Sequence, residues 1–370
     1  MLTCLSHGGR SVYRSQVPSN ELLIATIDGV VCLSRPDTPD AKAAWRVSRR
    51  SLEGKHISCL LIEPGREIIF AGTHGDGIYA SEDQGRTWLK KDRGVEFPDI
   101  YSMNFVENGG ELRLYAGTEP AHLFASNDLG ESWRELPSIR SVPSVEKWTF
   151  PGPPHIAHVK NITFDPRSAE TIYLSIEVGG ALKSLDGGKT WRELSGFYED
   201  VHRIVIPAQQ PEKLYITGGD GIYHSQDGGV TWEHLTDRSH RIAYPDALIP
   251  HPDNELLMFV SGAITSPGSW RKTQTADSRI GRSRDGGRSW QVLERGLPEH
   301  IRGNIEAMSM NVWPGGFSLF AGTTDGRIFF SDDEGESWST IAQGLPPVSK
   351  GGHYRNLPKV DAAAESAAAG

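Results

Sequence analysis

Ionisable side chains recur at the starts of short apolar runs along this chain of 370 residues. Several short apolar runs each open on two residues of mostly polar type, separated by one residue. If these runs are strands, the two side chains share one face, because side-chain direction alternates with a period of 2. The pairs are His56/Ser58, Ile100/Ser102, His158/Lys160, Asp200/His202, Tyr244/Asp246, Asn304/Glu306 and His353/Arg355. Interchangeable solvated positions would be richer in Ser, Thr and Gly.

These residue types suit metal or acid–base chemistry. Neutral imidazoles and ionised carboxylates are ligands for divalent metal ions, and His74, Glu119 and Glu177 in nearby turns add further candidates. We expect a divalent metal ion to be held by Glu119, His158, Glu177 and His202, with Asp246 beside them. The candidate catalytic residues are His158, Lys160, His202, Asp246, Glu306 and Arg355.

Two other interpretations use the same side chains. In the first, the acids pair with Lys160 and Arg355 in a buried polar network that has no part in chemistry. In the second, a His or Glu acts as a base without a metal ion, and Lys160, Arg203 and Arg355 bind a substrate carboxylate or phosphate. No short ligand motif such as His-Glu-x-x-His occurs. Residue types alone leave all three interpretations open.

A repeated segment indicates which elements must position these residues. The pattern Ser-x-Asp-x-Gly-x-Ser/Thr-Trp occurs six times, starting at Ser81, Ser126, Ser184, Ser225, Ser283 and Ser331. Two short apolar runs precede each copy and one follows it. The Asp can accept hydrogen bonds from backbone N–H groups of its own turn, the Gly supplies a positive φ, and the Trp begins the next strand. We interpret the repeat as a hairpin turn with a structural role.

This repeat resembles the Asp-box, or BNR, repeat of sialidases, sortilin-type receptors, photosystem II assembly factors and many bacterial propellers. The resemblance covers nearly the whole chain and implies a β-propeller. It also implies that the inner strands begin around the mouth of a central channel, on the face opposite the repeated turns. The candidate residues would converge at that mouth. Function does not follow from the fold, since the family includes glycosidases and binding scaffolds.

The six copies indicate six blades, and residues 22–47 supply a seventh that lacks the repeat. We expect an all-β, seven-bladed propeller with four-stranded antiparallel blades, formed as a single domain by residues 1–360. The first unit has no clear inner strand of its own. We expect residues 353–357 to supply it, so that the N- and C-terminal segments pair and close the ring. The alternative is that residues 1–13 supply this strand.

Two intervals between the repeats are longer than the others. Successive copies begin 41–48 residues apart, except for two intervals of 58 residues. The additional residues, 138–154 and 263–280, include Phe150 and Trp270 and are expected either to overhang the mouth or to decorate the surface. A polar turn at residues 7–10 (His-Gly-Gly-Arg) is expected to be a surface segment; the alternative is that it reaches the mouth, if the N-terminus runs near the ring closure.

Composition limits the partners and the compartment. The formal net charge of −9 argues against nucleic acid and anionic membranes as partners. Three cysteines are too few for a disulfide framework. The sequence shows neither an apolar signal segment nor a membrane span, so we expect a cytoplasmic location. Residues 361–370 are of low complexity and are expected to be disordered or left over from an expression vector.

The family's activities can be compared with these residues. Sialidases carry Phe/Tyr-Arg-Ile-Pro near the N-terminus, whereas residues 12–15 here are Val-Tyr-Arg-Ser. We expect a small-molecule enzyme, a metal-dependent hydrolase or lyase acting at the mouth on a substrate that Lys160 and Arg355 would bind if it is anionic. The alternatives are a non-catalytic scaffold that binds a protein or peptide, and a sialidase-like glycosidase.

Overall fold

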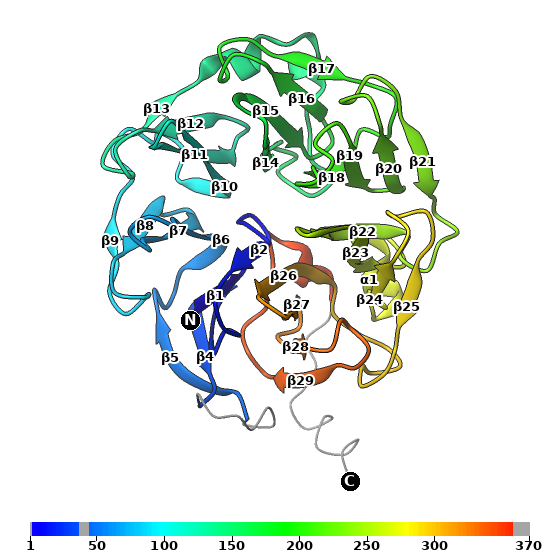
Figure 1. Ribbon diagram of the computed structural model, residues 1–370. Coiled ribbons are helices and arrows are strands. Elements are labelled where there is room, and N and C mark those ends of the chain that lie inside the picture. Colours follow the sequence, from blue (N-terminus) through cyan, green and yellow to red (C-terminus); the bar gives the residue numbers. More distant parts are fainter. Residues whose placement is uncertain (1, 37–43, 358–370) are drawn as a thin grey trace.

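The computed structural model describes residues 2–36 and 44–357. Within these ranges the strands form seven sheets, arranged around a central axis as the blades of a propeller (Figure 1). Six of these sheets have four strands and one has five. The predicted all-β, seven-bladed propeller is therefore confirmed. The prediction for residues 361–370 lies outside the described residues.

Blades 2 to 6 share one strand order, in which the chain starts near the axis and moves outward (Figure 1). Neighbouring strands within these blades are antiparallel. Their strands are β6 (His56–Ile62), β7 (Ile69–His74), β8 (Ile78–Ser81) and β9 (Leu89–Lys90) in blade 2; β10 (Asp99–Asn108), β11 (Glu111–Glu119), β12 (Leu123–Ser126) and β13 (Arg134–Glu135) in blade 3; β14 (Val159–Asp165), β15 (Ser168–Ile176), β16 (Gly180–Ser184) and β17 (Arg192–Leu194) in blade 4; β18 (Val201–Val205), β19 (Leu214–Gly218), β20 (Gly221–Ser225) and β21 (Glu233–Thr236) in blade 5; and β22 (Tyr244–His251), β23 (Asn254–Ala263), β24 (Arg279–Ser283) and β25 (Gln291–Leu293) in blade 6.

The two remaining blades are completed by the N-terminal segment. In blade 1 this segment supplies the innermost strand, which runs parallel to its neighbour, and in blade 7 it adds a parallel strand inside the blade. The strands are β1 (Leu2–Leu5), β3 (Glu21–Thr26), β4 (Gly29–Ser34) and β5 (Arg46–Ser51) in blade 1, and β2 (Val12–Arg14), β26 (Ile305–Trp313), β27 (Gly316–Thr323), β28 (Ile328–Ser331) and β29 (Ser339–Ala342) in blade 7.

The prediction that residues 353–357 supply the inner strand of blade 1 is wrong. Residues His353–Asn356 form a short 3-10 helix, η3, and the alternative, residues 1–13, is confirmed by the pairing of β1 with β3. The physical reason lies in the contacts that each segment makes. The run Leu2–Leu5 is largely buried in the sheet and occupies the inner edge of β3, whereas His353 is held over the mouth by Glu306 at 3.0 Å.

The connection between β1 and β2 passes through the channel beside other inner strands. The Gly8 N–H donates to the Ser58 carbonyl (3.1 Å), and the Gly8 carbonyl accepts from the Met103 N–H (2.9 Å). A Cβ atom on Gly8 would overlap the Tyr101 carbonyl oxygen, so only glycine fits this approach. The expectation of a surface segment at residues 7–10 is wrong, because the backbone of this turn pairs with blades 2 and 3.

The repeated segment forms the predicted structural turn. In the first copy the Ser81 hydroxyl donates to Asp83 (2.8 Å) and accepts from the Gly85 N–H (2.8 Å), while Asp83 accepts from the Thr87 N–H (2.8 Å). The same three bonds recur in the other five copies. Gly85 has a φ of 80°, which a residue with a Cβ rarely adopts. These acids are therefore engaged in turn formation.

Apolar side chains between adjacent blades form the core. Between blades 1 and 7, for example, Leu22 and Ile24 pack with Phe320 and Phe330. All three cysteines are buried and free of disulfide bonds. The described helices are α1 (Pro267–Thr273), η1 (Pro137–Ser141), η2 (Pro143–Lys147) and η3. None of the described helices is long and apolar enough to cross a membrane.

Candidate functional site

In blades 2 to 7, a β-bulge occurs near the start of the inner strand. In each of these blades, the bulge changes the direction of one side chain. The pairing register shifts by one residue at this point in β6, β10, β14, β18, β22 and β26. A bulge leaves one residue without a partner on the neighbouring strand and re-aims its side chain. The unpartnered residues are Ser58, Tyr101, Lys160, His202, Asp246 and Glu306. Four of these are predicted catalytic residues.

Glu177, directly after β15, is bound from two sides by residues of β14 and its approach. Glu177 Oε2 accepts from His158 Nε2 at 2.7 Å, and Glu177 Oε1 lies 2.7 Å from Lys160 Nζ. His158 Nδ1 lies 3.3 Å from Glu119 Oε2, and the His158 ring stacks on Tyr101 with a centroid distance of 3.6 Å. Carboxylate oxygens accept more than one bond, so Glu177 keeps lone pairs for a further ligand.

His202 and Asp200 face each other at the start of blade 5. His202 Nδ1 lies 2.7 Å from the Pro245 carbonyl oxygen, and since a carbonyl only accepts, Nδ1 carries the hydrogen of the neutral ring. His202 Nε2 lies 3.4 Å from Asp200 Oδ1, and neither of these buried atoms has a hydrogen-bond partner. In the neutral ring, two acceptors thus oppose each other. A positive ion between them, either a proton or a metal ion, would remove the repulsion.

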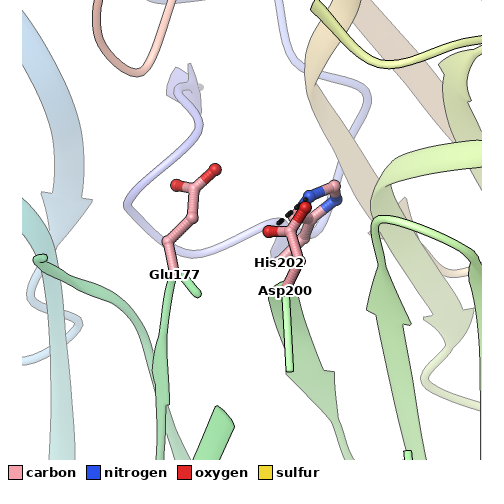
Figure 2. Close-up of side chains that lie close together, drawn as sticks. All are labelled: Glu177, Asp200 and His202. Carbon is pink, nitrogen blue, oxygen red and sulfur yellow. Dashed lines mark ion pairs between the residues drawn. The ribbon is translucent and has the colours of Figure 1, made fainter. Parts of the chain in front are cut away.

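Glu177, Asp200 and His202 together could hold a metal ion (Figure 2). Among the described residues, this is the group of His, Cys, Asp and Glu side chains whose ligand atoms converge, all within 4.8 Å of one another. Figure 2 shows Glu177 beside the close Asp200–His202 pair. The hydrogen bonds of His202 to a backbone carbonyl and of His158 to Glu177, together with the ion pair of Lys160 and Glu177, are of the kind that orient metal ligands.

The segment after β29 covers the mouth and brings Lys350 into it. Lys350 Nζ lies 2.7 Å from Asp246 Oδ1 and 3.8 Å from Glu177 Oε1. Glu306 accepts from the Lys350 N–H (2.9 Å) and the Ser349 hydroxyl (3.1 Å), and its other oxygen lies 3.0 Å from His353 Nδ1. These bonds hold the segment against the bulged residues of blades 6 and 7.

Both inserted loops contribute aromatic rings to the cover. The ring of Phe150, after η2, lies 5.3 Å from the ring of His158 and 6.1 Å from that of His353. Trp270 of α1 lies 6.1 Å from His353 and is completely buried. The expectation that the insertions 138–154 and 263–280 overhang the mouth is thus confirmed for Phe150 and Trp270. The start of the first insertion lies elsewhere, because the Ser138 hydroxyl donates to the Gly188 carbonyl (2.5 Å) in the repeated turn of blade 4.

Burial and unlike charges act in opposite directions on the titration of these groups. Burial favours the neutral carboxyl, but Lys160 and Lys350 outweigh it and hold the pKa of Glu177 well below its ordinary value. Burial likewise opposes ionisation of Asp246, but Lys350, His202 and Lys160 together outweigh it and lower the pKa of Asp246. Burial lowers the pKa of Lys160 to about 8 against the attraction of Glu177. For Lys350, burial is outweighed by Asp246, Glu177 and Glu306, which raise its pKa.

The structure brings most of the predicted site residues together and leaves one outside. His158, Lys160, His202, Asp246 and Glu306 all line the covered mouth. Arg355 does not join them, because it is exposed on η3 and its Nε donates to the Tyr354 hydroxyl (3.2 Å).

The predicted metal set is placed differently from what the sequence suggested. Glu177 and His202 belong to the converging group, but its third member is Asp200. Glu119 and His158 are not part of the converging group. His158 uses Nε2 to bind Glu177 and faces Glu119 with Nδ1.

Sequence reasoning missed Lys350 at this site and gave the approach of His7 to the mouth only as an alternative. Lys350 lies outside every repeat, in a segment without periodicity, and no local signal marks it. His7 lies in the connection between β1 and β2, is 3% exposed, and has no hydrogen-bond partner at either ring nitrogen. The adjacent Gly-Gly pair was the one available signal, since two glycines permit a close backbone approach.

Comparison with known proteins shows the fold alone. No protein-family model matches the chain, and no curated protein sequence matches it. A GH74 xyloglucanase from Xanthomonas campestris superimposes with a TM-score of 0.66 at 16% identity, over 92% of this chain and 55% of that enzyme. An ancestral GH74 enzyme gives a TM-score of 0.60 at 16% identity, over 84% of this chain and 40% of the other. This chain thus spans about half the length of these enzymes or less.

A similar solved structure belongs to a different functional class. YCF48 bound to D1 peptide superimposes with a TM-score of 0.52 at 15% identity, over 90% of this chain and 86% of YCF48. Seven-bladed propellers of this shape therefore include both glycoside hydrolases and a peptide-binding protein. Identities this low transfer neither activity to the present chain, so its function must be argued from its own site.

Proposed function

We propose that this protein is a small-molecule enzyme, a metal-assisted hydrolase or lyase, whose site is the covered mouth of the channel. The metal ligands in this proposal are Glu177, Asp200 and His202. The observation that carries it is the 3.4 Å approach of His202 Nε2 to Asp200 Oδ1. In a tetrahedral site with bonds of about 2.0–2.1 Å, two ligand atoms lie about 3.3 Å apart. This pair therefore already has the spacing of two metal ligands.

The residues around the triad supply the other requirements of such chemistry. A bound divalent ion would polarise a substrate oxygen or lower the pKa of a water molecule. Lys160, with a pKa lowered to about 8 by burial, can hold or release a proton near neutral pH. Lys350 remains charged and favours a substrate that bears a carboxylate or phosphate. The aromatic rings of Phe150 and Trp270 lie against His158 and His353 and limit the access of bulk water to these side chains.

The alternative functions have weaker support. A glycosidase of the usual kind needs two carboxyl groups that flank the substrate and stay free to act as acid and nucleophile or base; Glu177, Asp246 and Glu306 are each bound by a lysine or histidine instead. A scaffold that docks a peptide in the mouth would need a wider opening than a small-molecule substrate needs, and three segments cover the mouth. The two classes of similar structure do not favour either alternative for this chain.

Metal analysis of the purified protein tests the proposal. The protein is stripped with a chelator, reloaded separately with Zn²⁺, Mn²⁺ and Ca²⁺, and examined by elemental analysis and calorimetric titration. We expect one ion per chain, and loss of binding in Asp200→Asn and His202→Gln. The matched control is Asp253→Asn, which removes an exposed, ion-paired aspartate and should bind as the native protein does. Stripped and reloaded protein are then compared on chromogenic esters, lactones and phosphoesters.

Two results would contradict the proposal. Absence of any bound ion after reloading would mean that a proton lies between His202 and Asp200. Nitrogen-15 NMR would then show hydrogens on both nitrogens of the His202 ring. A bound ion that is unaffected by Asp200→Asn would place the metal site elsewhere.

A further inference from the structure

A cavity lies on the face of the propeller opposite the mouth. The inner strands begin at the mouth, so the turns that follow them lie on this opposite face. The cavity has a volume of about 590 Å³, and its wall includes residues of the turns after β6, β10 and β14, such as Pro64, Asn108 and Pro166. Ligand pockets commonly measure about 300–1,000 Å³. The cavity is thus large enough for a small molecule, and none of the three proposed metal ligands lines it.

Arg10, in the connection between β1 and β2, forms part of the wall of this cavity. Its Nε donates to Asn104 Oδ1 (3.0 Å), and its Nη2 donates to the Phe105 carbonyl (2.8 Å). The guanidinium carbon lies 3.5 Å from the centroid of the Phe105 ring. Asn104 is itself held, because its Nδ2 donates to the Ile162 carbonyl of blade 4 (2.8 Å). These contacts fix the position and the plane of the guanidinium.

The positive charge of Arg10 has no close counter-charge. Among the described residues, no carboxylate forms an ion pair with Arg10. A guanidinium has five N–H groups, and the bonds to Asn104 and Phe105 use two of them. Burial lowers the pKa of Arg10 to about 10, and the attraction of Tyr13 and Glu107 does not offset this effect. A cation that has lost hydration without gaining an anionic partner is a favourable place for an anion to bind.

The two acids on the wall leave Arg10 available. Asp165 is bound by Arg167, whose Nε and Nη2 lie 2.9 and 2.6 Å from its two oxygens. Glu107 is exposed, so water and salt screen its charge. The half-buried ring of Phe164 adds an apolar surface to the same wall. The cavity therefore combines one unpaired, partly desolvated cation with an aromatic ring.

We infer that this cavity binds a small organic carboxylate with a planar apolar body, through Arg10 and Phe164. The planar guanidinium matches the two oxygens of a carboxylate, which accept two parallel N–H bonds. The body of the ligand would pack against the Phe164 ring. Inorganic phosphate would meet the same charge but would gain nothing from the ring. This inference does not depend on the proposed function, since the two sites lie on opposite faces.

Calorimetric titration with benzoate tests the inference. We expect native protein to bind benzoate at millimolar concentration, and to bind benzamide, which has the same shape without the charge, at least about 10-fold more weakly. Arg10→Gln should weaken benzoate binding to a similar degree. The matched control is Arg35→Gln, because Arg35 is also half-buried and also lies over an aromatic ring, that of Trp45 at 5.0 Å. Its affinity for benzoate should equal that of the native chain.

A measurement on native protein keeps the inference testable if Arg10→Gln folds poorly. Benzoate should shift the backbone amide NMR signals of residues 107–109 and 167–169 and leave those of His158 and His202 unchanged. Absence of benzoate binding, equal binding of benzamide, or shifts confined to other residues would overturn the inference. Inorganic phosphate that binds as tightly as benzoate would overturn the role of the apolar body. None of these results bears on the metal site, so the proposed function would stand or fall separately.

Discussion

Lys350 Nζ lies 2.7 Å from Asp246 Oδ1, and both side chains are almost completely buried. Lys350 belongs to the segment that follows the last blade, whereas Asp246 is the bulged residue of β22. A buried ion pair is stable only while both partners are present, because either charge alone has lost its hydration without compensation. This pair therefore fixes the cover of the mouth to the wall of the channel.

Replacement of Lys350 with Met is expected to lower the free energy of unfolding by about 3–5 kcal/mol. The Asp246 carboxylate would stay buried, with the Asn304 amide at 2.6 Å as its remaining close donor. Urea denaturation followed by tryptophan fluorescence measures the change. The control is Arg14→Met, which breaks an exposed pair with Asp253 and should cost at most about 1 kcal/mol. Equal losses in the two variants would show that the pair does not fix the cover.

The stability of the propeller is expected to fall as the pH decreases from about 6.5. Burial, and then the neighbouring His56, lower the pKa of His74 from 6.5 to about 3. Between these two values the unfolded chain binds a proton that the folded chain does not bind, so the free energy of unfolding decreases with decreasing pH. From pH 6.5 to 5, this one group should cost about 2 kcal/mol. Urea denaturation at pH 7 and pH 5 measures the difference.

His74→Gln should make that pH dependence weaker. The glutamine amide can still donate to the Lys350 carbonyl, which His74 Nε2 approaches to 2.7 Å, but it takes up no proton. Burial also lowers the pKa values of His56 and His7, so part of the dependence should remain. His300→Gln is the control, because the His300 side chain is 69% exposed. An unchanged difference between pH 7 and pH 5 in His74→Gln would contradict this assignment.

Gly8→Ala is expected to destabilise the fold by at least about 1–3 kcal/mol, the usual cost of an added methyl group in a filled space. The new Cβ would overlap the Tyr101 carbonyl oxygen and force the connection between β1 and β2 out of the channel. Gly268→Ala is the matched control, since a Cβ on this residue of α1 meets no atom within 4 Å and alanine favours the helix. In thermal denaturation, the melting temperature should fall for Gly8→Ala and should rise for Gly268→Ala. A native-like melting temperature for Gly8→Ala would show that the crossing segment is not tightly held.

The repeats made the fold predictable, because each copy is a local hydrogen-bonded turn whose position sets the strands on either side. They also indicated the correct face, and period-2 alternation selected Lys160, His202, Asp246 and Glu306. The bulges were not predicted. In blade 3 the strand begins at Asp99 rather than Ile100, so the bulged residue is Tyr101 and the expected partner Ser102 is displaced by one position.

Residues outside the repeats could not be placed from the sequence. Ring closure by Leu2–Leu5 depends on a parallel pairing with β3, and no local pattern distinguishes it from an antiparallel strand supplied by the other terminus. His7 reaches the mouth because the N-terminal segment closes the ring. Lys350 reaches it because the segment after β29 covers it. Their roles follow from contacts between segments more than 100 residues apart, such as Lys350 with Asp246, which no spacing in the chain encodes.

Phe150→Ala is expected to open the mouth with little effect on stability. The Phe150 ring is half-buried and lies over His158 at 5.3 Å, whereas His158 itself is inaccessible. Removal of the ring should increase the rate at which diethyl pyrocarbonate modifies His158 several-fold, as measured by peptide mass spectrometry. The matched control is Phe97→Ala, since Phe97 is also half-buried and stacks on His122 at 4.0 Å; it should leave modification of His158 unchanged. If both variants react with His158 at the native rate, Phe150 does not limit access, and the cover formed by residues after β29 must open for a substrate to enter.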